Sequence, residues 1–354
     1  MLKKLLYIIL ILPISCIEPY KVELPQGEQL LTVDGFITTD SGPHIIRLTR
    51  SDTYGSVFQG LIRPVSQANV VIRDSEGNVT FLEEGIERGA YQTPPDFRAR
   101  VGISYTLLIT LLGGKSYTSL PERVAAVPEI LELSYSAVGF NTEDRLLDRS
   151  GARIFAHFND PSDQTNFYYW RVGARNYVLV ANPELYRLPG THPTNPRGEA
   201  PKACCAICYI QEPGRFQRFA IASDEGFNGL PQRLPVAFVE DDGLKFKQAY
   251  RAEILQMSIS ANAHRFLRLV EQQTSLTGSV FDSPPANIRG NMISLDDPNE
   301  IVLGFFMAAG VSKKEVYIKP GKLDIRQTPK TIPDDCLTVP GATLDPPAGW
   351  NPDN

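Results

Sequence analysis

The sequence predicts a mainly β protein with an N-terminal β-sandwich, a second β-rich domain and one long helix. Short stretches in which apolar and polar residues alternate recur along the chain, and such alternation is typical of half-buried strands. The 28 prolines and 27 glycines are spread between these stretches, which favours many short strands over long helices. Residues 260–274 instead place their apolar side chains at helical spacing after Ser260, a good N-cap residue.

Residues 30–125 are predicted to form the first domain. A hairpin is expected around the tetrapeptide Asp74 to Gly77, because two alternating runs flank it. About seven short strands in so short a stretch are typical of a sandwich. Their order resembles Ig-like or transthyretin-like modules, and this resemblance implies no chemistry. The predicted strands are 30–38, 44–49, 68–73, 78–83, 89–91, 104–112 and 115–120.

Residues 126–330 are predicted to form the second, β-rich domain. The aromatic run Tyr168, Tyr169 and Trp170 is expected to fill its core, with stacking on a sugar or peptide as the alternative. The helix is expected to pack on the second sheet, and residues 331–354 to form a Pro-rich tail. The predicted strands are 130–137, 152–159, 167–172, 216–223, 234–239, 250–258, 301–308 and 315–319.

The N-terminus has the pattern of an export signal. Lys3 and Lys4 precede an apolar run that is far shorter than the roughly 20 residues a membrane-spanning helix needs. Residues 1–15 are therefore predicted to be a lipoprotein signal peptide. The residues before Cys16 resemble a relaxed bacterial lipobox of the kind common in Bacteroidota, which implies a lipid on the Cys16 thiol. Residues 16–29 would then be a tether; the alternative is an ordinary signal peptide and a free Cys16 thiol.

Composition limits the classes of function. The 354 residues are 42% hydrophobic and 21% charged, which is typical of a folded globular protein. The formal net charge is −5, and no basic stripe interrupts the acidic balance. Nucleic acid is therefore not an expected partner.

A motif near the C-terminus carries a family resemblance. Gly278-Ser-Val-Phe-Asp-Ser-Pro-Pro285 continues through Ile288-Arg-Gly-Asn-Met292 to Leu303-Gly-Phe-Phe306. This pattern resembles a family of Bacteroidota outer-membrane lipoproteins catalogued as domain of unknown function 4249. The resemblance implies an outer-membrane lipoprotein whose gene often lies beside that of a TonB-dependent receptor, and it carries no catalytic residues. It also implies a second cysteine close to Cys336, which this sequence lacks.

Four cysteines follow Cys16, namely Cys204, Cys205, Cys208 and Cys336. An even number in an exported chain suggests disulfides, and three pairings of four cysteines are open. We expect Cys336 to join one of the other three and to pin the tail to the second domain. A redox pair of Cys205 with Cys208 and a four-cysteine zinc site are the alternatives.

Other chemistry lacks a recognisable pattern. The chain has no nucleophile elbow, P-loop or dinucleotide fingerprint. His44, His157, His192 and His264 are scattered, and the pairs Asp160/Asp163, Asp241/Asp242 and Asp296/Asp297 are expected to be solvated turn residues rather than Ca²⁺ ligands. We therefore predict no catalytic residue, no cofactor and no metal.

These observations favour a lipid-anchored outer-membrane binding or accessory module that works with a TonB-dependent transporter in nutrient uptake. Its ligand is not specified by the sequence, and its face could be periplasmic or external. The first alternative is a structural or adhesion lipoprotein without a small ligand. The second is a thiol-redox enzyme.

Overall fold

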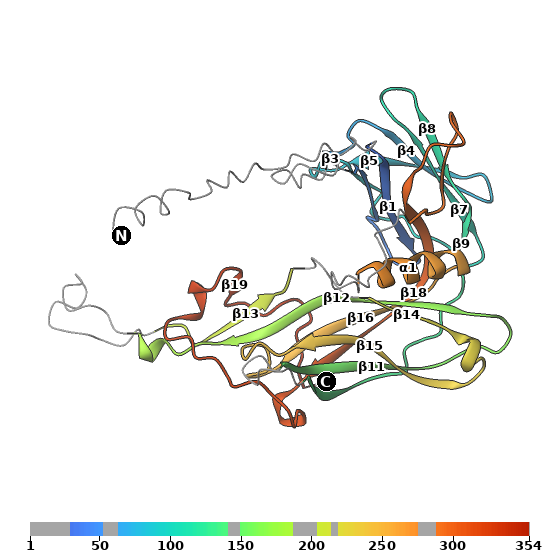
Figure 1. The fold of residues 1–354 in the computed structure, drawn as a ribbon. Coiled ribbons are helices and arrows are strands. Elements are labelled where there is room, and N and C mark those ends of the chain that lie inside the picture. The colour runs from blue at the N-terminus through green and yellow to red at the C-terminus, as the bar shows by residue number, and fades with distance from the viewer. Residues whose placement is uncertain are drawn as a thin grey trace, which may run out of the picture.

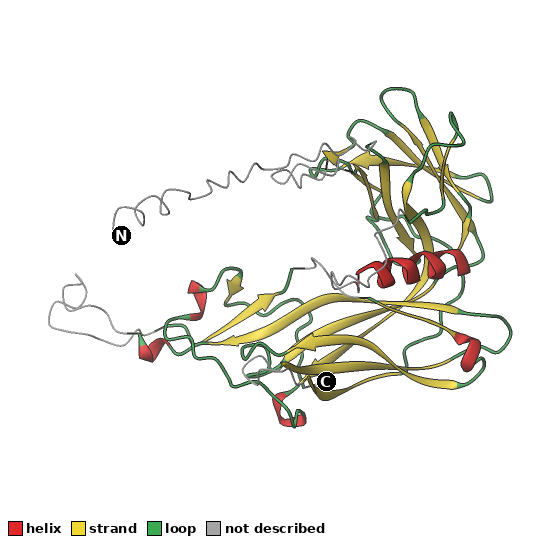
Figure 2. Ribbon diagram, in the orientation of Figure 1, coloured by secondary structure: helices red, strands yellow, loops and turns green. Residues whose placement is uncertain are grey.

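The computed structural model describes residues 29–51, 63–140, 149–186, 204–213, 219–274 and 288–353. Two β-sandwiches meet at an angle, and a single α-helix of the described chain lies at their junction (Figures 1 and 2). The predicted mainly β class is confirmed. The predicted signal peptide, Cys16, most of the tether, His192 and the Gly278–Pro285 motif lie outside the described residues.

The first sandwich has two layers that share strand β5. One layer has the order β17-β8-β7-β4-β5 and the other β5-β6-β2-β1-β18. Its core contains Val33, Leu48, Ile72, Leu107 and Phe306, each fully or almost fully buried. The strands of this part are β1 (Leu31–Thr38), β2 (Ile45–Arg50), β3 (Arg63–Pro64), β4 (Asn69–Asp74), β5 (Val79–Glu84), β6 (Ala90–Gln92), β7 (Ser104–Thr110), β8 (Ser116–Ser119), β9 (Glu122–Arg123) and β17 (Met292–Ser294).

The second sandwich packs a three-stranded sheet, β10-β11-β15, against a larger sheet, β18-β16-β12-β13-β19. Phe158, Tyr168 and Trp170 fill the core between the sheets. The sequence predicts this place for Tyr168, Tyr169 and Trp170, but Tyr169 instead packs in the separate core beside the helix. The remaining strands are β10 (Glu132–Phe140), β11 (Arg149–Asn159), β12 (Phe167–Val180), β13 (Ile207–Gln211), β14 (Ala220–Ser223), β15 (Pro231–Glu240), β16 (Tyr250–Ser258), β18 (Leu303–Ile318) and β19 (Ala342–Thr343).

Strand β18 belongs to both sandwiches. Its first half, from Leu303 to Ala309, pairs in parallel with β1. Its second half, from Gly310 to Ile318, pairs antiparallel with β16. The prediction of two separate strands at 301–308 and 315–319 was therefore wrong, because backbone pairing with β16 continues through the polar residues between them.

The helix α1 (Ala261–Thr274) covers the junction. Ser260 Oγ accepts a hydrogen bond from the Ala263 N–H at 3.1 Å, so Ser260 caps the helix as predicted. Ala263 and Leu267 pack in a third core with Tyr169 and Met257 of the second sheet and with Phe305 of β18. The helix thus contacts the second sheet, as expected, and also fills the space between the sandwiches.

Two predicted domain boundaries do not match the packing. Residues 288–309 complete the first sandwich, because β17 pairs with β8 and Asn291 is hydrogen-bonded to both Leu120 and Phe306. The first unit is therefore not limited to residues 30–125. The tail, predicted as residues 331–354, contributes β19 to the large sheet. Neither contact leaves a local signal, since each joins residues far apart in sequence.

The described chain also contains short 3₁₀ helices at Pro183–Leu185, Asp224–Gly226, Pro320–Lys322 and Cys336–Thr338. Among the described residues, no helix is both long and apolar enough to span a bilayer.

Candidate functional site: an arginine-lined cleft

A cleft of about 520 Å³ lies beside β15 in the second sandwich, where this strand forms the edge of its sheet among the described strands. Its walls come from both sheets, since β11 and β15 supply one side and β12 and β14 the other. We call it the arginine cleft and define it by Arg149, Arg153, Arg175, Phe219, Phe238 and Glu240.

Gly151 lies between Arg149 and Arg153 on β11. The ring of Phe238, from the neighbouring strand β15, packs against Gly151. A Cβ atom at position 151 would come within 2.6 Å of Phe238 Cζ, so only glycine leaves room for the ring. Phe140 and Phe238 pack edge to face, with the ring centroids 5.4 Å apart. An aromatic ring therefore lies against the strand midway between the positions of two arginines.

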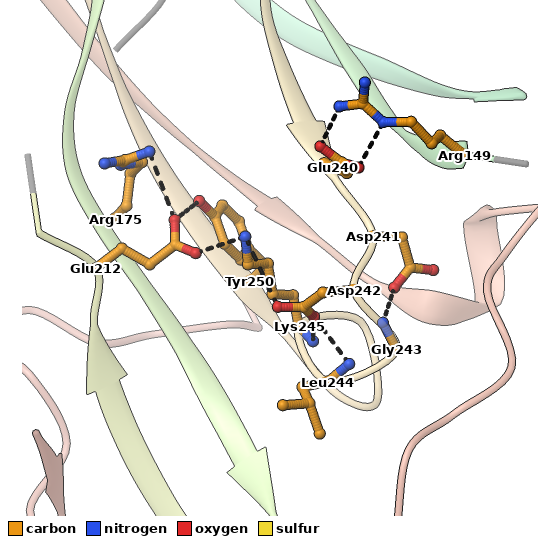
Figure 3. Close-up of polar contacts among 10 residues, drawn as sticks. All are labelled: Arg149, Arg175, Glu212, Glu240, Asp241, Asp242, Gly243, Leu244, Lys245 and Tyr250. Carbon is orange, nitrogen blue, oxygen red and sulfur yellow. Dashed lines mark hydrogen bonds and ion pairs between the residues drawn. The ribbon is translucent and has the colours of Figure 1, made fainter. Parts of the chain in front are cut away.

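Arg149 is paired within the cleft. Its Nε donates to Glu240 Oε1 at 2.7 Å and its Nη2 donates to Glu240 Oε2 (Figure 3). The two parallel bonds match the planar fork of a guanidinium to a carboxylate. This hydrogen bonding to Glu240 raises the pKa of Arg149. Because both side chains are about half exposed, we expect the pair to contribute little to stability.

Arg175 lies on the opposite wall, on β12. Its Nη2 donates to the Pro213 carbonyl oxygen at 2.7 Å, and its Nη1 is 3.6 Å from Glu212 Oε2. Its Nε is buried and has no hydrogen-bond partner. An unpaired buried donor of a charged group is costly, so this N–H is available to a bound acceptor.

Glu212 organises the wall behind Arg175. It accepts a hydrogen bond from the Tyr250 hydroxyl at 2.7 Å and pairs with Lys245 Nζ at 2.7 Å (Figure 3). Burial, and then the nearby Glu212 carboxylate, raise the pKa of Tyr250, so this hydroxyl stays protonated and donates. Glu212 is thus shared among three donors.

The turn after β15 positions Lys245. Asp242 Oδ1 accepts from the N–H groups of Leu244 and Lys245, at 2.9 and 3.1 Å. Asp241 accepts from the Gly243 N–H and the Gln327 N–H, both at 2.8 Å. The predicted loop pair Asp241/Asp242 therefore holds a turn by hydrogen bonds to backbone, and Asp241 is buried rather than solvated.

Arg153 is half-buried and forms no hydrogen bond or ion pair with any residue in the described part of the chain. The cleft thus holds three guanidinium groups and one lining carboxylate, within a chain of net charge −5. Its local charge is opposite in sign to that of the whole protein.

The structure joins Cys208 to Cys336 and Cys204 to Cys205. Both Cys208 and Cys336 are fully buried in the second core, and their bond attaches the tail to β13. The structure thus pairs Cys336 with Cys208, one of the three cysteines that the sequence offers as its partner. None of the four cysteines keeps a free thiol for the redox or zinc interpretations. Cys16 lies outside the described residues.

The remaining sequence candidates are structural. Tyr168 and Trp170 are core residues, and Trp170 Nε1 donates to Gln256 at 2.9 Å, so neither ring is available for stacking on a ligand. Asp160, predicted as a solvated turn residue, is buried and accepts from Tyr168 and from the Gly229 N–H. Asp296 accepts from the Ser116 N–H, and Asp297 from the Asn299 N–H.

The three histidines in the described residues lie outside the arginine cleft. His44 packs against Phe97, His157 Nε2 is hydrogen-bonded to the Ser134 hydroxyl at 2.7 Å, and His264 packs against Phe167. Within the described ranges, no three His, Cys, Asp or Glu side chains are grouped to hold a metal ion.

The cleft arginines were not singled out from the sequence. An arginine on a strand face is usually solvated, and Arg153 and Arg175 lie on strands of different sheets. A local signal lies at Gly151, just before the predicted strand 152–159 and inside β11 in the structure, since a glycine within a strand suggests close approach of another group.

The protein is thus a β protein of two sandwiches, with a positively charged cleft that is large enough for a small solute. The chain belongs to the family described as Domain of unknown function (DUF4249), whose model matches residues 17–315. A comparison with curated protein sequences found no match.

Proposed function

We propose that this protein is a lipid-anchored binding and accessory module of the outer membrane that works with a TonB-dependent transporter. The observation that carries the binding part is the arginine cleft, since a concave site with converging polar groups is the usual form of a ligand site. The lipobox-like residues before Cys16 support the anchor, and the family resemblance supports the receptor as partner. A purely structural or adhesive lipoprotein does not require such a cleft.

The cleft lies in the second sandwich, and the proposed anchor precedes the first sandwich in the sequence. A lipidated Cys16 would hold the protein on the membrane, because acyl chains bind bilayers through their buried CH2 groups. The first sandwich would then separate the cleft from the anchor. This order suits a protein that holds a solute beside a transporter.

Affinity purification from native cells tests this proposal. The tagged full-length protein is extracted in mild detergent, and the co-purifying proteins are quantified by mass spectrometry. We expect a TonB-dependent receptor in near-stoichiometric amount. A Cys16→Ser variant is the matched control, and it should lose membrane attachment in fractionation. Recovery of the wild-type protein without any receptor would refute the accessory role.

A further inference from the structure

We propose that the arginine cleft binds a small solute in which an oxyanion, carboxylate or phosphate, is attached to a flat apolar body. This proposal rests on the binding role proposed above and specifies its ligand class. It follows from the unpaired donors, the shape of the cleft and the internal carboxylate that occupies part of it.

The unpaired donors come from the two walls. Arg153 has no partner in the described chain, and Arg175 Nε is buried without an acceptor. Guanidinium groups favour carboxylate and phosphate because their N–H donors match two oxygens at once. An oxyanion between the walls would supply acceptors to both groups, which no described side chain does.

The shape of the cleft indicates more than an inorganic ion. Its volume of about 520 Å³ lies in the range of small-molecule sites. The Phe238 ring, placed over Gly151, offers a flat face, and Phe219 lies in the lining contributed by the other sheet. A planar apolar group suits these aromatic surfaces.

Glu240 marks where such an oxyanion binds. Its carboxylate forms the two parallel bonds with Arg149 that a ligand carboxylate would form. The Glu240 carboxylate therefore pairs with one of the three guanidinium groups, and its negative charge repels an incoming anion. Neutralising Glu240 should strengthen ligand binding, whereas a residue with only a structural role would not have this effect.

Calorimetric titration of the full-length protein in detergent tests the proposal at low salt. The probes are phenyl phosphate and benzoate, with benzyl alcohol as the uncharged comparison. For solutes of this size, we expect a dissociation constant of roughly 1 mM or tighter for at least one anion. Phenyl phosphate binding alone would assign phosphate esters as the class, and benzoate binding alone would assign carboxylates. Binding should weaken as salt is added.

Three variants locate the site. Arg153→Gln should weaken anion binding by about ten-fold or more, and it breaks no ion pair of the described residues. Glu240→Gln should tighten binding several-fold. Arg233→Gln is the control, because Arg233 lies on the same strand β15 but over Phe155, outside the cleft. We expect it to bind as the wild type does.

Three results would overturn the proposal: no anion binds, benzyl alcohol binds as tightly as the anions, or Arg153→Gln binds like the wild type. The receptor experiment is separate from this titration. A receptor that co-purifies with a protein that binds no anion would leave the accessory function standing and reject the ligand class alone.

Discussion

Replacing Glu122 with glutamine should change how the stability of this protein depends on pH. Glu122 begins β9 and is only 2% exposed. Asn291 Nδ2 donates to its Oε1 at 3.3 Å, and its Oε2 has no hydrogen-bond partner. Burial raises the pKa of Glu122 to about 7, and the polar side chains of Ser260 and Asn291 offset only part of this effect.

The sign of the change in unfolding free energy with pH depends on whether the folded or the unfolded protein binds the proton of Glu122 more tightly. Between the ordinary pKa of 4.5 and the folded pKa of about 7, the folded protein keeps a proton on Glu122 that the unfolded chain releases. The free energy of unfolding therefore falls as the pH rises through this window. At about 1.36 kcal/mol per pKa unit, the full loss is about 3 kcal/mol.

Glu122→Gln removes the ionisable group and keeps its size. We expect the variant to be more stable than the wild type by about 3 kcal/mol at pH 8 and by less than about 1 kcal/mol at pH 5. Urea denaturation followed by circular dichroism at the two pH values measures this difference. Glu83→Gln, an exposed carboxylate in the same sandwich, is the control and should keep the wild-type pH dependence.

An equal effect of Glu122→Gln at pH 5 and pH 8 would refute the reasoning, because it would show that the carboxyl does not titrate between these values. A variant that is less stable at pH 8 would refute it more strongly. It would mean that the ionised carboxylate is stabilised where it lies.

Three further results are expected. Cys336→Ser should lower the free energy of unfolding by about 5 kcal/mol in the chain-entropy model, since the Cys208–Cys336 bond closes a separation of 128 residues; thermal scans of variant and wild type compare them. Gly304→Ala should abolish soluble expression, because Gly304 has φ +87° and an added Cβ would collide with the Val33 carbonyl. The control is Gly77→Ala, which has φ +91° but open space around it, and it should lower the free energy of unfolding by only about 1 kcal/mol. Leu267→Ala should cost about 2–4 kcal/mol, because Leu267 is buried in the junction core, and urea denaturation measures this.

Local signals predicted some elements of this fold closely, whereas β13 (Ile207–Gln211) and the part of β12 beyond Val172 were not predicted. The strand 250–258 has the predicted bounds, and the predicted end of the helix at Thr274 is also correct, because Ser260 and the apolar spacing after it are local features. The parallel pairing of β1 with β18 was not predicted, because its partners lie some 270 residues apart and neither strand specifies the other. The same holds for the pairings of β17 with β8 and of β19 with β13, which join residues that the predicted boundaries separate.

The cleft was harder to predict than the fold. Arg149, Arg153 and Arg175 have the sequence context of solvated side chains, and only the packing of one sheet on the other brings Arg175 to the two arginines of β11. Their chemistry therefore depends on tertiary structure. The cysteines were easier to single out, since their number and the export signal already suggest disulfides, although their pairing required the structure.

Strand β18 has a mechanical consequence. A pull on the chain ahead of β1 reaches that strand at Leu31, and the second sandwich holds β18 from its far end, beyond Ala309. Because the two strands run in parallel, these forces act in opposite directions along their common axis. The register pairs from Thr32–Leu303 to Thr38–Ala309 are then loaded in shear and must break together rather than one at a time. A protein tethered by its N-terminus and pulled through its second sandwich would resist extension at this junction.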